Sequence, residues 1–280
     1  MSISPPYFSH IVVFIGLPLK HLNRHSIDLA DGERVELAVG TRLGGGQQGE
    51  VLQVSDEQYN NCCLKIIRKP SEFDRELAVL RALQGVPGVV LYMGCNVDTN
   101  IIMMSPVHKK TLQYYKGNAA CLNRAWSQLV DVFKAVHDRG FAYRDFRGSN
   151  ILVEQLEWRS GFKCKVHLTD FGTTLSLGEA YPYEGTLRHG AGSVLSSLER
   201  HGRLHPVVCS RETELESLVK MMYILEEKLS TSLDGINPMA DDGCEKLRVW
   251  WEETENEMDD RSLSRLHSAR NGDYAALRNI

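Results

Sequence analysis

The 280-residue sequence lacks the features that mark several common functional classes. It has no basic excess, because its formal net charge is -4 at pH 7, whereas a nucleic-acid-binding protein carries a basic footprint. Its seven cysteines form no C-x-x-C pair and no disulfide-like spacing. This pattern fits a reducing intracellular compartment, and we expect the cytoplasm, with the nucleus as the alternative. The apolar stretch at 11–19 is too short to span a bilayer and follows no basic region, so we interpret it as a packed strand or segment. We therefore expect neither a nucleic acid nor a membrane as a partner.

Internal repeats and low-complexity segments are also absent, so the organisation of the chain must be inferred from its motifs. Hydrophobic residues make up 42% and charged residues 24% of the sequence, as in a soluble globular protein. The length allows one or two domains with a substantial core.

Two short motifs contain residue types that handle protons and magnesium. YRDFRGSN at 143–150 includes Asp145 and Asn150, and DFG at 170–172 begins with Asp170. These side chains suit a base and two metal ligands, Asn150 and Asp170, in a phosphoryl-transfer enzyme. Each motif alone is weak, so the motifs that precede them decide the interpretation.

A glycine-rich segment and a strand lysine lie upstream. LGGGQQGEV at 43–51 contains G-x-G-x-x-G-x-V, in which glycine lets backbone amides approach phosphate oxygens. A dinucleotide-binding turn would open a helix at the last glycine, but residues 50–54 alternate between polar and apolar like a strand. The pattern therefore predicts a strand-loop-strand flap. Lys65 follows in the apolar run CCLKII at 62–67, where an edge-strand charge is the alternative interpretation.

A helix is predicted after this strand. Ser71 and Asp74 form a short capping box before a run of apolar residues at helical spacing. In this helix Glu76 is the candidate ion-pair partner that would hold the Lys65 ammonium toward the phosphates of a nucleotide. Glu72 is the alternative partner of Lys65. Glu76 is otherwise interpreted as a solvated glutamate on the helix surface that makes no ion pair with Lys65.

The order of these motifs resembles that of a eukaryotic-type protein kinase, from about residue 39 to about residue 225. The resemblance implies an α+β, bilobal fold with a small antiparallel β-sheet lobe that carries one helix and a mostly helical, shortened large lobe. We expect an N-terminal extension at 1–35, which contains a turn at 31–32, the small lobe at 36–106, and the large lobe with divergent C-terminal helices at 107–280.

The resemblance also implies an activity, the ATP-dependent transfer of the γ-phosphoryl group to serine or threonine hydroxyls of a protein substrate, with autophosphorylation as a further expectation. Asp145 would orient the attacking hydroxyl, and Asn150 and Asp170 would hold Mg²⁺. Arg147 would contact the transferring phosphate or its acceptor; an arginine here also resembles some cytoplasmic tyrosine kinases and leaves the acceptor hydroxyl open. Thr186 would bridge Asp145 and its basic neighbour, which favours serine/threonine specificity. Met104 would be the gatekeeper of the adenine pocket. The expected ATP contacts are Leu43, Gly44, Gly45, Gly46, Gln47, Gln48, Gly49, Glu50, Val51, Cys63, Lys65, Met104, Ser105, Val107 and Leu152.

Several residues depart from the family pattern. The sequence has Ser193 where A-P-E would place a glutamate that ties down the activation segment. RETELESL at 211–218 resembles the casein kinase 1 group, with Glu214 in place of an aspartate that caps catalytic-loop amides. We expect the longer Glu214 side chain to weaken this cap by ~1 kcal/mol. Arg144 is expected to pair with a phosphate on one of the activation-segment hydroxyls, which are those of Thr173, Thr174, Ser176, Tyr181 and Tyr183.

Other interpretations stay open at this point. A pseudokinase would keep the fold and signal by contact, and Ser193 and Glu214 favour it. A small-molecule phosphotransferase of the aminoglycoside kind shares the aspartate-asparagine loop but fits the glycine motif and DFG less well. His201, His205 and Cys209 recur every four residues like metal ligands on a helix, although a proline interrupts that helix.

Overall fold

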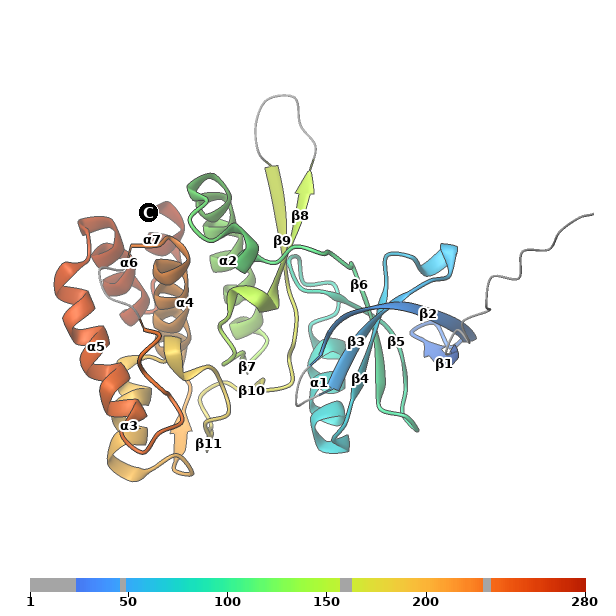
Figure 1. Cartoon of the computed structure of the whole chain (residues 1–280), viewed down its shortest axis with the longest axis horizontal. Helices are drawn as coiled ribbons and strands as arrows, with labels where there is room; N and C mark the ends of the chain where they lie inside the picture. Colours follow the sequence, from blue (N-terminus) through green and yellow to red (C-terminus); the bar gives the residue numbers. More distant parts are fainter. Residues whose placement is uncertain (1–23, 46–48, 157–162, 229–232) are drawn as a thin grey trace, which may run out of the picture.

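The computed structural model describes residues 24–45, 49–156, 163–228 and 233–280, and it has two lobes (Figure 1). A β-rich lobe lies on the right of the view and a helical lobe on the left. The predicted α+β, bilobal architecture is therefore confirmed. The apolar segment at 11–19 lies outside the described residues, and so do Gly46, Gln47 and Gln48.

Six antiparallel strands of the small lobe form one closed sheet in the order β1-β2-β3-β4-β6-β5. The predicted turn at 31–32 joins β1 to β2, which pair with Ile27 opposite Val35. β1 closes the sheet by pairing with β5, where Asp28 lies opposite Cys95. Residues 24–35, which the sequence analysis assigned to an extension, thus contribute a strand and a turn to the sheet. The strands are β1 Arg24–Leu29, β2 Arg34–Gly45, β3 Gly49–Val54, β4 Cys63–Ile67, β5 Leu91–Asn96 and β6 Ile101–Ser105.

The two faces of these strands have different environments, because successive side chains of a strand point to opposite sides. On β4, Leu64 belongs to the core inside the closed sheet, and Lys65 therefore points to the other side. On β6, Met103 belongs to the same inner core, whereas Met104 belongs to the core cluster that continues into the large lobe. Lys65 and Met104 thus share the face that looks toward the helices.

The helix α1 (Pro70–Ala82) is the predicted small-lobe helix, but it begins differently from the prediction. Its N-cap is Lys69, which makes no side-chain cap, and Pro70 occupies the first turn. Proline fits there because its φ is already helical and its missing N–H would have no partner in the first turn. The predicted capping box of Ser71 and Asp74 is therefore wrong, since Ser71 lies inside the helix.

In the large lobe, the apolar residues between 121 and 137 recur at helical spacing and form α2 (Ala119–Asp138). The Asn118 side chain caps it by accepting from the Cys121 N–H at 3.0 Å. Among the described residues, no helix is both long and apolar enough to cross a membrane. The other helices are α3 Gly192–His201, α4 Arg211–Leu225, α5 Gly243–Glu257, α6 Asp260–Arg270 and α7 Tyr274–Asn279. Short strands form three pairs: β7 Phe141–Ala142 with β10 Leu175–Ser176, β8 Ile151–Leu156 with β9 Lys163–Leu168, and β11 Ala180–Pro182 with β12 Pro206–Val208.

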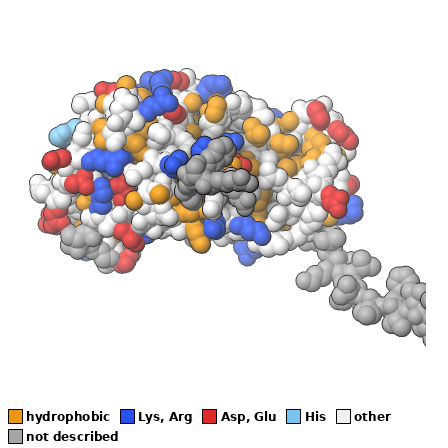
Figure 2. Space-filling model, turned by 90° about the horizontal axis from the view of Figure 1, so that it is seen from above, with side chains coloured by type: hydrophobic (Ala, Val, Ile, Leu, Met, Phe, Trp, Pro, Cys, Tyr) orange, Lys and Arg blue, Asp and Glu red, His pale blue; other side chains and the backbone are white. Residues whose placement is uncertain are grey.

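The end of β9 joins the two lobes. The Leu168 N–H donates to the Gly88 carbonyl at 2.7 Å, and the Val90 N–H donates to the Leu168 carbonyl at 3.1 Å. These bonds hold β9 against the segment between α1 and β5. Seen from the side of the β8–β9 hairpin, acidic and basic side chains are interspersed over the large lobe (Figure 2).

Candidate active site

The YRDFRGSN segment at 143–150, which we call the catalytic loop, meets the DFG segment because both adjoin the same end of the β8–β9 hairpin. Ile151, the first residue of β8, pairs with Leu168, the last residue of β9. Asn150 directly precedes β8, and Asp170 follows β9 by two residues. The Thr169 N–H donates to the Asn150 carbonyl at 3.0 Å. Two segments that are distant in sequence are thus held side by side.

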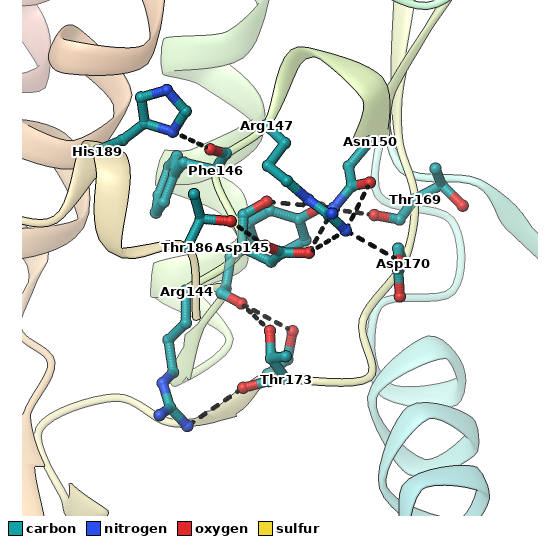
Figure 3. Close-up of polar contacts among 12 residues, drawn as sticks. Arg144, Asp145, Phe146, Arg147, Asn150, Thr169, Asp170, Thr173, Thr186 and His189 are labelled. Atoms are coloured by element: carbon teal, nitrogen blue, oxygen red, sulfur yellow. Dashed lines mark hydrogen bonds and ion pairs between the residues drawn. The ribbon is translucent and has the colours of Figure 1, made fainter. Parts of the chain in front are cut away.

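The Asp145 carboxylate is buried and receives three donors (Figure 3). The Thr186 hydroxyl donates to Oδ1. Arg147 Nη2 donates to Oδ2 at 2.8 Å, and Asn150 Nδ2 donates to the same oxygen at 2.7 Å. The predicted bridge from Thr186 to Asp145 is present, with the basic neighbour on the other oxygen. These three hydrogen bonds fix the orientation of the Asp145 carboxylate. A general base must be held in this way to accept a proton from a nearby hydroxyl.

Lys65 lies between two carboxylates. Its Nζ donates to both oxygens of Glu76 at 2.7 Å and to Asp170 Oδ1 at 2.8 Å. Glu76 is therefore the partner of Lys65, while the alternative, Glu72, pairs with Lys69 at 2.9 Å. The ion pair connects β4 and α1 to the DFG segment and brings both lobes to the site.

Lys65 and Asp170 stabilise each other's charge, whereas burial outweighs Lys65 at Glu76 and raises the pKa of that carboxyl above its ordinary value. Burial alone would lower the pKa of Lys65, but the carboxylates of Glu76 and Asp170 outweigh it and raise the pKa above its ordinary value. Burial alone would raise the pKa of Asp170, but Lys65 and then Arg147 bring it below its ordinary value. Near neutral pH the site therefore holds a cationic Lys65 and an ionised Asp170.

Backbone strain coincides with both motifs. Arg144 has φ +72° and Asp170 has φ +63°, in the left-handed region that residues other than glycine rarely adopt. Such conformations persist only where the surroundings impose them, and they gather at functional sites. Here Glu214 holds the Arg144 backbone and Lys65 holds the Asp170 side chain.

The glycine-rich segment forms the predicted flap. β2 and β3 pair with Gly44 opposite Val51, which confirms strands on both sides of the loop and excludes the dinucleotide-binding turn. The loop residues at 46–48 lie outside the described part. A Cβ on Gly49 would lie 1.9 Å from the Ile66 carbonyl oxygen, so close packing on β4 requires glycine here. The remaining residues of this segment that are predicted to contact ATP lie on the two strands. These are Leu43, Gly44 and Gly45 on β2, and Glu50 and Val51 on β3.

Several side chains that are predicted to line an adenine pocket lie in or against one core cluster. Cys63 on β4 lies opposite Met104 on β6, on the same face as Lys65. Val51 and Leu152 are partly buried and pack against the large core cluster, which also contains Cys63 and Met104. These side chains come from both lobes, as an adenine pocket requires, and each also contributes to the core.

The segment after β6 has a partner that the sequence did not indicate. The Val107 N–H, predicted to face the adenine edge together with the backbone of Ser105, donates to the Asn61 carbonyl at 3.1 Å and to Asn61 Oδ1 at 3.2 Å. Asn61 lies in the turn before β4, so only the fold brings it here. Adenine would have to compete with Asn61 for this donor.

Glu214 caps the catalytic loop. Its Oε2 accepts from the Tyr143 N–H at 2.5 Å, and its Oε1 accepts from the Arg144 N–H at 3.2 Å. The expectation that the extra methylene displaces the carboxylate is therefore wrong, because the side chain reaches both amides from α4. His137 is a buried core histidine, and its Nε2 lies 3.6 Å from Glu214 Oε2.

A second glutamate of α4, Glu216, holds the end of the activation segment, where the sequence lacks the glutamate of A-P-E. Glu216 Oε1 accepts from the Gly192 N–H at 3.0 Å and pairs with Lys220 at 2.9 Å and with Arg270 at 3.1 Å. Lys220 in turn donates to the Gly190 carbonyl at 3.2 Å. The end of the activation segment is thus tied to α4 and α6. Sequence reasoning missed this role, although Glu216 lies in the RETELESL segment.

Arg144, which is expected to pair with a phosphate, donates to carbonyl groups of the activation segment in the structure. Its guanidinium donates to the Thr173 carbonyl at 3.3 Å (Figure 3) and to the Pro182 carbonyl at 2.5 Å. Thr173 and Thr174 are buried, and their hydroxyls donate to the Tyr143 carbonyl. The Arg144 guanidinium therefore connects two parts of the activation segment, at Thr173 and at Pro182.

The comparison with protein families agrees with this geometry. A family model described as a protein kinase domain matches residues 37–203, which is more than half of the 280 residues. The match includes the glycine segment, Lys65, the catalytic loop, DFG and Thr186. The chain therefore belongs to the protein kinase family.

Proposed function

We propose that this protein kinase transfers the γ-phosphoryl group of ATP to serine or threonine hydroxyls of a protein. The observation that carries the proposal is the Asp145 carboxylate, which Thr186 and Arg147 hold from opposite oxygens. The Thr186 hydroxyl favours serine or threonine as acceptor, in keeping with the resemblance to serine/threonine kinases. Autophosphorylation is part of the proposal, because Ser176 on β10 is partly exposed.

The cofactors of this reaction would be ATP and Mg²⁺. Asn150 Nδ2 donates to Asp145, so its Oδ1, which also accepts from Arg147 Nη2 at 3.4 Å, is the atom that would bind a metal, and Asp170 would contribute carboxylate oxygens. Oxygen donors of this kind fit a hard divalent cation. When bound, the metal would neutralise phosphate charge.

The protein's own residues would perform the remaining steps. Lys65, held by Glu76, offers a positive charge to the phosphates. Asp145 would accept a hydrogen bond from the acceptor hydroxyl and orient it for in-line attack. Arg147 is about half exposed and lies within reach of Asp145 and Asp170, so it could contact the transferring group.

Transfer of labelled phosphate from Mg-ATP to a generic protein and to the enzyme itself tests the proposal. Asp145→Asn should lower transfer at least 100-fold, as general acid-base groups contribute roughly 10² to 10⁴. Asp98→Asn, an exposed aspartate in the β5–β6 loop, is the matched control and should keep wild-type activity. Phosphoamino-acid analysis of the product then tests the acceptor class. Equal signal from wild type and Asp145→Asn would refute catalysis by this site.

A pseudokinase is the second candidate function, and the bond from the Val107 N–H to Asn61 favours it. If Asn61 blocks the adenine edge, nucleotide should not raise the melting temperature, and phosphate transfer should be absent. Saturable ATP binding together with transfer that depends on Asp145 would reject this alternative.

We also propose an intracellular location, cytoplasmic or nuclear. All seven cysteines are free and buried in the structure, as is usual in a reducing compartment. The acidic net charge of -4 supports a protein substrate over a nucleic acid. Localisation of a tagged full-length chain by microscopy tests this proposal.

A further inference from the structure

Two histidines and a glutamate gather at the β8–β9 hairpin. His108 follows β6, Glu154 lies on β8 and His167 lies on β9. One ligand atom from each lies within 4.8 Å of the others, and this is the only such group of three found among the described residues. None of these side chains takes part in the catalytic site described above.

The fold brings the three side chains together by strand register. Leu152 pairs with His167, and Glu154 pairs with Lys165. Residues directly opposite in an antiparallel pair share a face, so Glu154 and His167 are diagonal neighbours on one face of the hairpin. The segment that carries His108 is held along β8, because the Val153 N–H donates to the Lys110 carbonyl at 2.9 Å.

The geometry of the group is close to that of a metal site. His167 Nε2 lies 3.5 Å from Glu154 Oε2. The rings of His108 and His167 stack with centroids 5.5 Å apart and an interplanar angle of 29°. Four-coordinate zinc with bonds of about 2.0–2.1 Å separates its ligand atoms by roughly 3.3 Å. The separations, which are at most 4.8 Å, must therefore shrink by no more than roughly 1.5 Å to reach this value.

The polar atoms of this group lack other partners. His108 Nε2 and His167 Nε2 are both buried from solvent and make no hydrogen bond in the structure. Buried polar atoms are nearly always hydrogen-bonded, and those that are not often mark a binding site for water or an ion. Burial lowers the pKa of both imidazoles, and the neutral imidazole is the form that binds a metal.

We propose that His108, Glu154 and His167 form a site for Zn²⁺. Two imidazole nitrogens and one carboxylate are a zinc ligand set that leaves one position open for water, whereas Mg²⁺ and Ca²⁺ take oxygen ligands. The ion ties the segment between the lobes to the β8–β9 hairpin, and thereby joins the backbone near Val107 to the strand that carries Leu152.

Zinc titration of the metal-free full-length chain tests the proposal. Bound zinc is measured by competition with a chromophoric chelator and by elemental analysis after gel filtration. We compare wild type with His167→Gln and with Glu154→Gln, which is nearly isosteric and partly exposed. His201→Gln is the matched control, because His201 is exposed, its Nδ1 contacts the Ser197 carbonyl of its own helix, and it forms no group of three metal-ligating side chains with His205 and Cys209 among the described residues. Circular dichroism verifies that each variant is folded.

We expect one zinc per chain in wild type and in His201→Gln, and at least tenfold weaker binding in Glu154→Gln and His167→Gln. At a zinc concentration about 100 times the Kd, the wild-type Tm should rise by roughly 5 °C. Cobalt substitution should give the visible absorption of a four-coordinate ion in wild type only. Absence of zinc binding, or equal affinity in folded Glu154→Gln, would overturn the proposal. None of these measurements uses ATP, so the result is independent of kinase activity.

Discussion

Replacing Glu216 by glutamine should destabilise the large lobe. Burial alone would raise the pKa of Glu216, but Lys220 and Arg270 bring it from 4.5 to about 2. This difference of about 2.5 pH units, at 1.36 kcal/mol per unit, corresponds to about 3 kcal/mol of folding free energy. The Glu216 side chain is only 7% exposed, so solvent screening reduces this value little. Burial lowers the pKa of Lys220 below its ordinary value even beside Glu216, so removing this closest counter-charge would leave a buried ammonium that the fold already disfavours.

The sign of the pH dependence follows from the folded pKa, which lies below the unfolded one. The stability contributed by Glu216 is fully present above pH 4.5 and is lost as the pH falls toward about 2. Urea unfolding followed by circular dichroism at pH 7 should show a loss of about 3 kcal/mol in Glu216→Gln. Hydrogen exchange should also become faster at the Gly192 amide, which Glu216 accepts from.

Glu252→Gln is the matched control. Glu252 also pairs with a cation four residues away on its helix, Arg248, but its side chain is 60% exposed. Exposed pairs of this kind contribute about 0.2–1 kcal/mol, so the control should change the unfolding free energy by less than 1 kcal/mol. If Glu216→Gln costs no more than Glu252→Gln, the argument that Glu216 ties down the activation segment is refuted.

Three further predictions follow from single contacts. Gly49→Ala should lower the Tm and weaken nucleotide binding, because its Cβ would lie 1.9 Å from the Ile66 carbonyl; an unchanged Tm by calorimetry would contradict this packing. Glu214→Ala should lower the free energy of unfolding by about 2–4 kcal/mol, because it leaves two buried catalytic-loop amides unpaired. Urea unfolding measures this loss, and a loss below 0.5 kcal/mol would show that water replaces the carboxylate. Burial lowers the pKa of His189 from 6.5 to about 4, so the stability of the fold should fall as the pH drops from 6.5 to 4. His189→Gln should flatten that part of the curve of Tm against pH. Parallel curves for wild type and variant would exclude His189 as the cause.

The motifs that depend on local geometry could be recognised in the sequence. Glycines, an alternating strand and a lysine one strand later specify a flap above a charged site, and the order of these motifs identified the family before any coordinates. Lys65 and Glu76 were also paired correctly, because one is on a strand and the other is on the helix that follows it. Such contacts depend on neighbouring elements whose arrangement the family pattern implies.

The capping box at Ser71 failed for a local reason. A serine followed three residues later by an acidic residue resembles an N-cap, but Pro70 is better suited to the first turn and shifts the start of the helix. Glu214 failed for a different reason. The length of one side chain does not indicate where its backbone lies, and α4 is placed so that the longer carboxylate still reaches both amides.

The sequence was sufficient for the family, the two-lobed fold and the residues of the catalytic loop, because each of these follows from short-range spacing and element order. Tertiary structure alone revealed Asn61 on the Val107 N–H, Glu216 with Arg270 beneath the activation segment, and His108 beside Glu154 and His167. These contacts join residues that are about 13 to 59 positions apart on separate elements. Their distances depend on how strands register and how helices pack, and no local pattern of residue types encodes those quantities.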